Sequence, residues 1–348
     1  MDFKKHLISS KLNIRDALQK LNLLGSDAIL FVINDSENLV GSLTDGDVRR
    51  GLLKGYTIDD KVIDIIQNST KYIRKGDGDV KKIIKYRDNQ FNIIPVLDKH
   101  SDRIVKIINF RTLKSYLPID VVIMAGGKGK RLRPLTENVP KPLLKVGDKA
   151  IIDHNLDRLI TYGVDDFWIS VNYLGDQIES HFNDRNIEGI EIDFIQEKMP
   201  LGTIGAVRNI SNFKHEHILI TNSDLLTNVD YEKFYLDFLD SGADFSVISI
   251  PYKVEIPYAI FENKNRRITG FQEKPTHSFL SNGGIYLMKR NVLDLIPKDS
   301  FFNTTDLMDE LIALDRNIIT YPHNGYWLDI GQMDDYERAQ DDIKQIQL

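Results

Sequence analysis

The sequence predicts an α/β protein in which a domain with a mostly parallel sheet follows a smaller α+β domain. Three observations support this fold class. The chain has 348 residues, more than one ordinary core accommodates, so two domains are expected. Apolar strands and helices alternate from Ile119 onward, and a shorter strand–turn–strand pattern occurs twice before it. Pro118 interrupts the pattern, so the boundary is predicted between about Leu113 and Asp120, giving domains at 1–117 and 118–348.

The composition excludes several classes of protein. The chain contains no cysteine, which excludes a disulfide framework, a thiolate metal site and a cysteine nucleophile. Its 42% hydrophobic and 28% charged residues are typical of a globular protein, and its net charge of −6 argues against non-specific nucleic-acid binding. No window approaches the roughly 20 apolar residues of a membrane span, and the N-terminus does not look like a signal peptide. A cytoplasmic protein without membrane or nucleic-acid partners is expected.

The first half of the chain contains two similar units, each predicted to run helix, strand, turn, strand, helix. The corresponding strands are expected at 28–33 and 92–97, and at 39–44 and 103–109. A repeat of this length implies that the two units pack together and cover each other's apolar face.

These units resemble CBS domains, which occur in pairs, and here would cover about 1–60 and 61–117. The most specific piece is GSLTDGDVRRGL, in which a strand is followed by Thr44 and Asp47 at the start of a helix. The resemblance implies that Thr44 and Asp47 contact the phosphate and ribose of an adenine or guanine nucleotide, and that the protein forms a homodimer. A carboxylate can accept two hydrogen bonds from vicinal ribose hydroxyls.

Two alternatives to this regulatory site stay open. The second unit has Asn109 and Thr112 where the resemblance requires Thr and Asp, so one nucleotide site is expected rather than two. Asp47 could also simply cap the helix that follows it, because Asp is a favoured N-cap residue. The pair would then have a structural or dimer-forming role.

The second half is predicted to form a mostly parallel sheet with helices on both faces. Strands are expected at 120–125, 166–172, 191–197, 217–222 and 245–252. Helices are expected at 153–163, 174–184, 204–213 and 229–242. Strands that alternate with helices in this way usually form a parallel sheet. In such sheets, ligands bind beyond the carboxyl ends of the strands.

The stretch VVIMAGGKGKRLRPLT, residues 121–136, places three glycines and four cationic side chains directly after the first of these strands. This composition predicts an anion site. A Walker phosphate loop does not fit, because Val122 stands at its first glycine and Gly129 at its Ser or Thr. A dinucleotide fingerprint fits poorly, because Leu132 occupies the position of its third glycine. A solvated basic loop would not require this glycine spacing.

The same stretch, followed closely by PKPLL, resembles the signature of sugar-phosphate nucleotidyltransferases. The details are most similar to the mannose-1-phosphate guanylyltransferase branch. The resemblance implies a Rossmann-like, mostly parallel sheet, and it implies that Arg131 and Lys141 stabilise phosphate charge during catalysis. The backbone that approaches the nucleoside triphosphate would belong to Ala125, Gly126, Gly127 and Gly129.

Four further segments continue the resemblance in order: MPLGTIGAV (199–207), FQEKP (271–275), SNGGIYLM (281–288) and YWLDIGQMDDYERA (326–339). They imply that Gly202 also approaches the nucleotide and that Lys274 is a catalytic residue on the sugar phosphate. Sugar contacts are implied for Glu273, Asn282 and Gly283. Gln332 and Met333 replace the small residue and proline usual in the last segment.

Two aspartates are implied to hold a catalytic Mg²⁺. Asp224 ends a strand and Asp329 precedes Ile330 and Gly331, and hard oxygen ligands suit this cation. The alternative for each is a helix or turn cap. Asp334 and Asp335 are expected in the first turn of the last helix. The eight histidines show no metal-ligand spacing, and His215 and His217 are expected to be exposed.

The resemblance implies that an NTP and a sugar 1-phosphate react to give an NDP-sugar and pyrophosphate. GTP is the favoured donor, while thymidylyl, uridylyl, cytidylyl or adenylyl transfer is left open, as is the choice between mannose and an amino or deoxy sugar. A hypothesis of another class is a sensor that binds sugar nucleotides without turnover. The set Arg131, Lys141, Asp224, Lys274 and Asp329 argues against the sensor.

Overall fold

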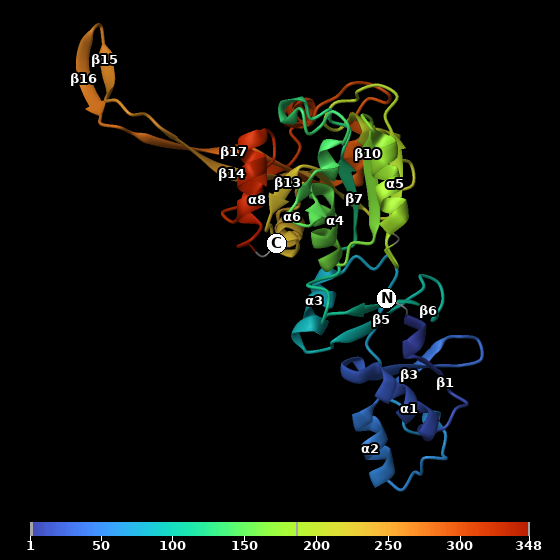
Figure 1. The fold of residues 1–348 in the computed structure, drawn as a ribbon. Helices are drawn as coiled ribbons and strands as arrows, with labels where there is room; N and C mark the ends of the chain where they lie inside the picture. The colour runs from blue at the N-terminus through green and yellow to red at the C-terminus, as the bar shows by residue number, and fades with distance from the viewer. Residues whose placement is uncertain (1–2, 186, 347–348) are drawn as a thin grey trace. The chain divides into compact units, whose positions relative to one another are not determined.

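The computed structural model describes residues 3–185 and 187–346. The chain divides into two compact units (Figure 1). The first comprises Met1–Pro118 with the short segments Ile160–Asp165 and Asn186–Ile190, and the second comprises the remainder. Among the described residues, no helix combines the length and the apolar character needed to cross a membrane.

The first unit contains two three-stranded sheets with the same topology. In each, the first strand pairs parallel and the third pairs antiparallel with the strand between them. The sheets consist of β1 (Leu7–Ser9), β2 (Ile29–Ile33) and β3 (Leu39–Thr44), and of β4 (Ile73–Arg74), β5 (Ile93–Leu97) and β6 (Ile104–Asn109). The duplication expected from the sequence is therefore present in the strand order.

The helices of the first unit show one departure from the expected repeat. They are α1 (Ile14–Leu24), α2 (Asp45–Leu53) and α3 (Val80–Asp88), with short 3₁₀ turns η1 (Phe3–His6), η2 (Gly25–Asp27) and η3 (Val62–Asp64). The helix expected after the last strand of the second repeat is not formed. The Asn109 side chain accepts a bond from the Arg111 amide and donates to Asp27, and Pro118 lies shortly before the next strand, so the chain continues without a helix.

The second unit is built on a seven-stranded sheet in the order β11–β10–β7–β12–β17–β14–β18. The strands are β7 (Ile119–Met124), β10 (Asp166–Val171), β11 (Glu191–Gln196), β12 (His217–Asn222), β14 (Phe245–Glu255), β17 (Thr276–Lys289) and β18 (Ile318–Pro322). Only β17 runs antiparallel to its neighbours, so the sheet is mostly parallel, as the sequence predicted.

In the described part of the second unit, five α-helices accompany this sheet: α4 (Ile151–Thr161), α5 (Gly175–Arg185), α6 (Tyr231–Ser241), α7 (Thr304–Ala313) and α8 (Met333–Asp342). The helix expected at 204–213 is instead a short 3₁₀ turn, η6 (Gly205–Asn209). Its first amides are bonded to the Phe302 carbonyl rather than within a helix, and a Cβ on Gly205 would lie 2.6 Å from the Ser300 carbonyl oxygen. Close backbone contact with the segment before α7 therefore decides the local structure.

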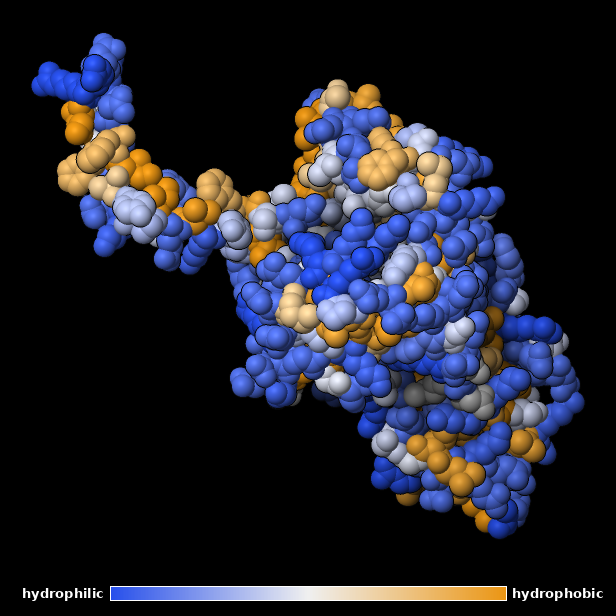
Figure 2. Space-filling view, turned by 45° about the horizontal axis from the view of Figure 1, so that its top comes forward, coloured by the Kyte–Doolittle hydropathy of each residue, from blue (hydrophilic) through white to orange (hydrophobic). Residues whose placement is uncertain are grey.

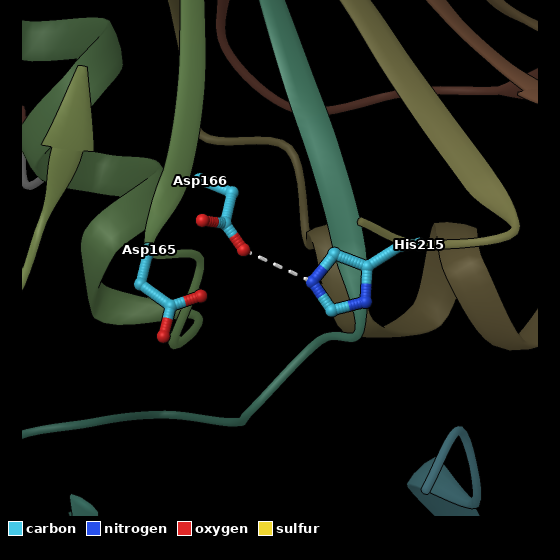
Figure 3. Close-up of side chains that lie close together, drawn as sticks. All are labelled: Asp165, Asp166 and His215. Atoms are coloured by element: carbon cyan, nitrogen blue, oxygen red, sulfur yellow. Dashed lines mark hydrogen bonds and ion pairs between the residues drawn. The ribbon is translucent and has the colours of Figure 1, made fainter. Parts of the chain in front are cut away.

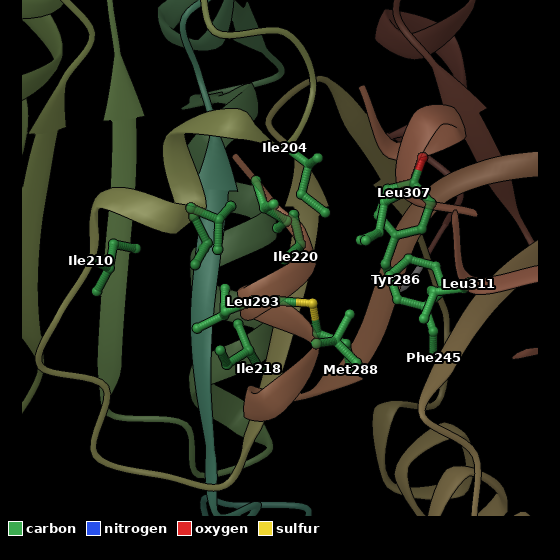
Figure 4. Close-up of a cluster of buried hydrophobic side chains, with 14 of the residues drawn as sticks. Ile204, Ile210, Ile218, Ile220, Phe245, Tyr286, Met288, Leu293, Leu307 and Leu311 are labelled. Carbon is green, nitrogen blue, oxygen red and sulfur yellow. The ribbon is translucent and has the colours of Figure 1, made fainter. Parts of the chain in front are cut away.

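One hydrophobic cluster fixes the centre of the sheet against α7 and η7 (Arg290–Leu295) (Figure 4). Ile220 of β12 and Met288 of β17 are completely buried, as are Leu307 and Leu311 on one face of α7. Burial of each such side chain contributes roughly 1.5–3 kcal/mol relative to exposure. This cluster holds the strands whose ends carry the polar residues described below.

A smaller cluster supports a corner of the unit beside the strand ends. Here β13 (Leu225–Thr227) pairs antiparallel with β19 (Trp327–Asp329), and the pair β8 (Lys145–Val146) and β9 (Lys149–Ala150) precedes α4. The buried side chains beneath them are Leu132, Val146, Leu226, Leu328 and Ile330. The 3₁₀ turns η4 (Lys130–Leu132) and η5 (Lys141–Leu143) complete this corner.

Polar side chains tie the starts of the central strands together at the opposite end of the sheet. His215 Nε2 lies 3.2 Å from Asp166 Oδ2 (Figure 3), and the His215 amide donates to Asp120 at 2.7 Å. Burial alone would raise the pKa of Asp166, but hydrogen bonds from His215 and Lys214 lower it below its ordinary value. The expectation that His215 and His217 are exposed was wrong, since both are half-buried by the strands beside them.

The outer parts of β14 and β17 leave the sheet as a two-stranded ribbon, and the hairpin β15 (Ile260–Lys264) and β16 (Arg267–Gln272) forms its tip (Figure 1). We call residues 252–281 the arm. No residue between 251 and 280 is buried. Figure 2 shows hydrophobic side chains alternating with hydrophilic ones along it.

Candidate active site

A cavity of about 510 Å³ lies beyond the carboxyl ends of the central strands of the second unit. Met124 ends β7, Asn172 follows β10 and Asn222 ends β12, and all three line the cavity. Parallel strands present their carboxyl ends at one edge, which is where ligands bind in open α/β sheets. The cavity therefore occupies the position that the sequence predicted.

The glycine turn after β7 forms one wall of this cavity. Gly126, Gly127 and Gly129 line it, whereas Ala125 is buried just before the turn and its amide donates to the Ser170 carbonyl at 2.8 Å. Gly129 has a left-handed φ of 58°, and a Cβ there would lie 3.1 Å from the Lys141 side chain. The turn thus packs tightly on its protein side while its backbone is presented to the cavity.

Lys141 meets two carboxylates at the floor of the site. It is 8% exposed, its ammonium group donates a hydrogen bond to Asp224, and the same nitrogen lies 4.0 Å from Asp329 Oδ1. The pairing of β13 with β19 brings the two aspartates together, because Leu225 is the register partner of Asp329 and the Ile330 amide donates to the Asp224 carbonyl at 3.0 Å. The predicted cation and both predicted metal ligands are therefore neighbours.

Each of the two aspartates has one carboxylate oxygen that accepts no hydrogen bond from the described residues and could bind a ligand. The Oδ1 atoms of Asp224 and Asp329 are both buried, and neither has a hydrogen-bond partner among the described residues. Burial raises the pKa of Asp329, and the neighbouring Asp224 charge raises it further, against the opposing effects of Lys141 and Arg131. Buried anionic oxygens without donors, close together, fit a hard divalent cation such as Mg²⁺.

Arg131 reaches the same corner from η4. Its guanidinium packs against Gly331, where a Cβ would lie 3.3 Å from a guanidinium nitrogen, and both residues line the cavity. Gly331 directly follows Asp329 and Ile330, so the segment that carries a predicted metal ligand also supports a predicted catalytic cation. Asp334 and Asp335 lie in the first turn of α8, as expected, and Asp335 accepts a bond from the Gln332 amide.

Gly202 lines the opposite wall. It has a φ of 81°, and a Cβ there would lie 2.5 Å from the Phe302 carbonyl oxygen. Glu197 holds this loop in place, because one of its carboxylate oxygens accepts a bond from the Leu201 amide at 3.0 Å and the other accepts from Ser170 at 2.6 Å. These contacts require a residue without a side chain at position 202.

Glu197 and Asn172 also line the cavity, and sequence reasoning missed both. Glu197 is 6% exposed, and Asn172 donates to its carbonyl at 2.9 Å. The available signal was their position, since each is the last residue of a predicted strand, where parallel strands end at a common edge. An acid at the end of β11, immediately before the PLGT sequence, could have been included on that ground.

The residues predicted for the sugar side are not gathered in this cavity. Asn282 lies on β17, where its side chain donates to the Tyr286 hydroxyl at 2.8 Å, and the Gly283 carbonyl accepts from Trp327 at 2.9 Å. Glu273 and Lys274 lie on the exposed arm, and neither lines the cavity. Their assignment to the sugar and its phosphate stays a prediction.

Thr44 and Asp47 lie in the first unit, at the start of α2, and form a capping box. Asp47 is 4% exposed and accepts hydrogen bonds from the Thr44 amide and hydroxyl. Its other oxygen accepts from Arg50 at 2.5 Å and from Gln67 at 2.9 Å. Burial alone would raise the pKa of Asp47, but these bonds lower it. Asp47 therefore stabilises the start of α2, as considered, but as the third helical residue of the capping box, while Thr44 is the N-cap. Its nucleotide role stays a prediction.

Several known proteins are similar to this chain. It is 29% identical over 228 residues to D-glycero-α-D-manno-heptose 1-phosphate guanylyltransferase of Aneurinibacillus thermoaerophilus, covering 65% of this chain and 99% of that protein. It is 31% identical over 236 residues to mannose-1-phosphate guanylyltransferase of Mycobacterium tuberculosis, where it covers 65% of this chain and 64% of the relative.

Solved structures are also similar to this chain. HddC from Yersinia pseudotuberculosis, 25% identical in sequence, superimposes with a TM-score of 0.52 over 65% of this chain and 99% of that protein. The same protein complexed with GMP-PN gives a TM-score of 0.50 at 26% identity. The family model described as nucleotidyl transferase matches residues 120–346, which include every cavity residue named above. The chain therefore belongs to the nucleotidyl transferase family.

Proposed function

We propose that the chain transfers a guanylyl group from GTP to a sugar 1-phosphate and releases pyrophosphate. The observation that carries the proposal is the cavity floor, where Lys141 and Asp224 lie beside a glycine turn and Asp329 lies next to them, outside the cavity lining. A triphosphate requires fixed positive charge and backbone amides close to its phosphates. Two relatives named as guanylyltransferases support the choice of base and of a sugar phosphate as acceptor.

In the proposed reaction, an oxygen of the sugar phosphate attacks the α-phosphorus of GTP. The new P–O bond forms as the bond to pyrophosphate breaks, and the electron pair leaves with the pyrophosphate. Lys141 and Arg131 face the cavity and would stabilise the negative charge on the α-phosphate and the leaving group. The protein contributes position and charge rather than a nucleophile, because the sugar phosphate brings its own.

The two aspartates would hold a Mg²⁺ ion through their unpartnered oxygens. Such an ion supplies positive charge that neutralises the triphosphate and polarises its phosphorus centres. Lys141 has a second role in the protein: its charge offsets the repulsion between the two neighbouring carboxylates, and its hydrogen bond orients Asp224.

Glu197 supports guanine as the base. It presents a carboxylate at the cavity wall, where each oxygen accepts one protein hydrogen bond and has a second lone pair that can accept another. Guanine offers adjacent N1–H and 2-amino donors, whereas uracil and thymine offer a single N–H donor on that edge. The proposal thus places the base near Glu197 and the loop of Gly202, and the phosphates at the glycine turn.

Pyrophosphate release with a panel of nucleoside triphosphates and hexose or heptose 1-phosphates tests this function. The expected result is release that requires Mg²⁺ and is fastest with GTP. Fastest release with another triphosphate would overturn the choice of base while keeping the reaction. No release with any pair, together with measurable binding of a sugar nucleotide, would favour the non-catalytic sensor.

For the first unit we propose a CBS pair with a regulatory role. Its support is the duplicated strand order and the position of Thr44 and Asp47 at the start of α2. Arg50 pairs with Asp47 while its side chain is 60% exposed, so a phosphate could recruit it from the surface. Calorimetric titration with adenine and guanine nucleotides, compared between the parent and Asp47→Ala, tests the site. Equal binding by both proteins would remove Asp47 from it.

A further inference from the structure

The arm carries large apolar side chains that no other described part of the same chain covers. Phe261 and Phe271 are register partners across the β15–β16 hairpin and are 58% and 66% exposed. Other large apolar side chains exposed along the arm are Tyr252, Tyr258, Ile268, Phe279 and Leu280. An isolated two-stranded hairpin is marginal in water, and a continuous exposed apolar surface usually marks an interface. The arm therefore requires a partner surface.

The direction of the arm is fixed by the sheet. Its strands continue the β14–β17 ladder without interruption from the pair Ser249–Asn282 to the pair Glu255–Thr276. A strand rises about 3.3 Å per residue, so Lys274, beyond Thr276, lies roughly 25 Å past Ser249. Bending this ribbon back over the cavity of the same chain would break ladder hydrogen bonds, which makes closure within one chain costly.

The topology places the base of the arm at the same edge of the sheet as the cavity. β14 and β12 run in the same direction, because each is antiparallel to β17 between them. The arm leaves β14 at its carboxyl end, and the cavity lies beyond the carboxyl end of β12. A second copy of the chain that faces this edge about a twofold axis would receive the arm at its own cavity, and would return its arm reciprocally.

The charge of the arm suits an anionic substrate bound at that destination. Its charged residues are Lys253, Lys264, Arg266, Arg267 and Lys274, against Glu255, Glu262 and Glu273. The arm is thus net cationic, whereas the whole chain carries a net charge of −6. It also carries the EKP segment, which the sequence assigns to the sugar and its phosphate but whose Glu273 and Lys274 do not line the cavity of the same chain.

We propose that two copies of this chain exchange arms, so that Lys274 and Glu273 of each copy complete the cavity of the other. This inference rests on the proposed function and on the role that the sequence predicts for Lys274 at the sugar phosphate. In each cavity, one chain provides the floor with Lys141 and Asp224. The second copy provides Lys274, which contacts the sugar phosphate. The exposed aromatic residues of the arm are buried against that copy.

Complementation between two inactive variants tests the exchange. Asp224→Asn disables the floor, and Lys274→Ala disables the arm. Purification through two different affinity tags isolates the heterodimer from cells that express both variants. One of its two cavities combines an intact floor with an intact arm, so we expect about half of the parental kcat per dimer, while each homodimer falls by about 10²-fold. Asn263→Ala, which changes an exposed residue of the same arm outside its charged set, should keep most activity.

A heterodimer no more active than the two homodimers would overturn the proposal, because each Lys274 would then serve its own chain. A monomeric parent protein in light scattering at the assay concentration would also overturn it. Folding of each variant is checked by thermal melting before the comparison.

A readout without activity separates this inference from the proposed function. The chain has no cysteine, so a short bis-maleimide reacts only at introduced thiols. Thr276→Cys on one tagged chain and Lys128→Cys, at the cavity wall, on the other should cross-link between the chains of the heterodimer. A cross-link without pyrophosphate release from the parent protein would reject the function and keep the exchange. An active parent protein that shows neither the cross-link nor complementation would keep the proposed function and reject the exchange of arms.

Discussion

Lys141 donates a hydrogen bond to Asp224, although 83 positions separate the two residues in the sequence. Lys141 follows Pro140 in η5, and Asp224 lies between β12 and β13. Both side chains are largely withdrawn from water, with exposures of 10% and 22%. In such surroundings, removal of one partner leaves the other charge buried and uncompensated. The pair therefore links the stability of the cavity floor to its proposed chemistry.

Asp224→Asn should reduce kcat by about 10²-fold or more, because it removes a negative ligand from the proposed metal site while preserving the shape of the side chain. The dependence of rate on Mg²⁺ concentration should shift to higher concentrations. Pyrophosphate release over a Mg²⁺ series measures both effects. Asp334→Asn, an acid of the first turn of α8, is the matched control and should behave like the parent. An unchanged rate in Asp224→Asn would exclude this residue from the site.

Lys141→Met should destabilise the protein as well as inactivate it. The substitution keeps much of the side-chain volume but leaves Asp224 without its cation, next to Asp329. Breaking a buried pair in this way commonly costs about 3–5 kcal/mol. Mg²⁺ should recover part of that loss, because a bound cation replaces the missing charge. Urea unfolding with and without Mg²⁺ measures the difference, and equal stabilisation of parent and variant by Mg²⁺ would contradict this explanation.

Gly202→Ala and Gly127→Ala should separate a structural glycine from one that only approaches a ligand. A Cβ at Gly202 would lie 2.5 Å from the Phe302 carbonyl oxygen at a positive φ, so we expect a loss of about 1–3 kcal/mol in the free energy of unfolding. A Cβ at Gly127 meets no atom within 4 Å, so its stability should be unchanged while its affinity for GTP falls. Denaturant unfolding and calorimetric GTP binding distinguish the two. Equal free energies of unfolding for the two variants would contradict the structural role of Gly202.

Asp47→Ala should destabilise the first unit by about 1–2 kcal/mol, because it removes the capping box of α2 and leaves Arg50 and Gln67 without their acceptor. Asp45→Ala is the matched control, since Asp45 is an exposed acid of the same first turn. Chemical unfolding followed by circular dichroism makes the comparison. A loss of stability that is equal for the two variants would show that the cap itself contributes nothing.

His217 should make the free energy of unfolding fall as the pH is lowered below neutrality. Burial lowers its pKa from 6.5, and its neutral Nδ1 lies 2.8 Å from the Tyr235 hydroxyl, which can donate to it. The unfolded side chain binds a proton near pH 6.5 while the folded one does not, so stability is present above that pH and is lost as the pH falls toward the folded value. Unfolding of the parent and of His217→Gln between about pH 7.5 and about pH 5.5 tests this. The free energy of unfolding of His217→Gln should fall less over this range than that of the parent. Identical pH dependence in the two proteins would exclude His217 as a cause of the loss.

The sequence by itself determined where the main strands begin and which residue types form the floor of the site. Apolar runs placed the start of each expected strand within one residue of its position in the structure, because strands buried on both faces are apolar along their length, but they did not predict strands such as β1, β4 and β18. The motifs identified Arg131, Lys141 and Asp224 by residue type and order. They also identified Gly202, where the structure shows that no Cβ can be accommodated.

Only the tertiary structure decided which of these residues meet. The register of β13 on β19 brings Asp329 beside Asp224, the end of β11 adds Glu197 to the wall, and backbone contact with Phe302 turns an expected helix into a 3₁₀ turn. The ladder of β14 with β17 carries Lys274 away from the cavity. Local sequence patterns encode the conformation of a segment, whereas register, strand direction and long-range packing arise from contacts between residues far apart in the chain, and those contacts leave no local pattern to read.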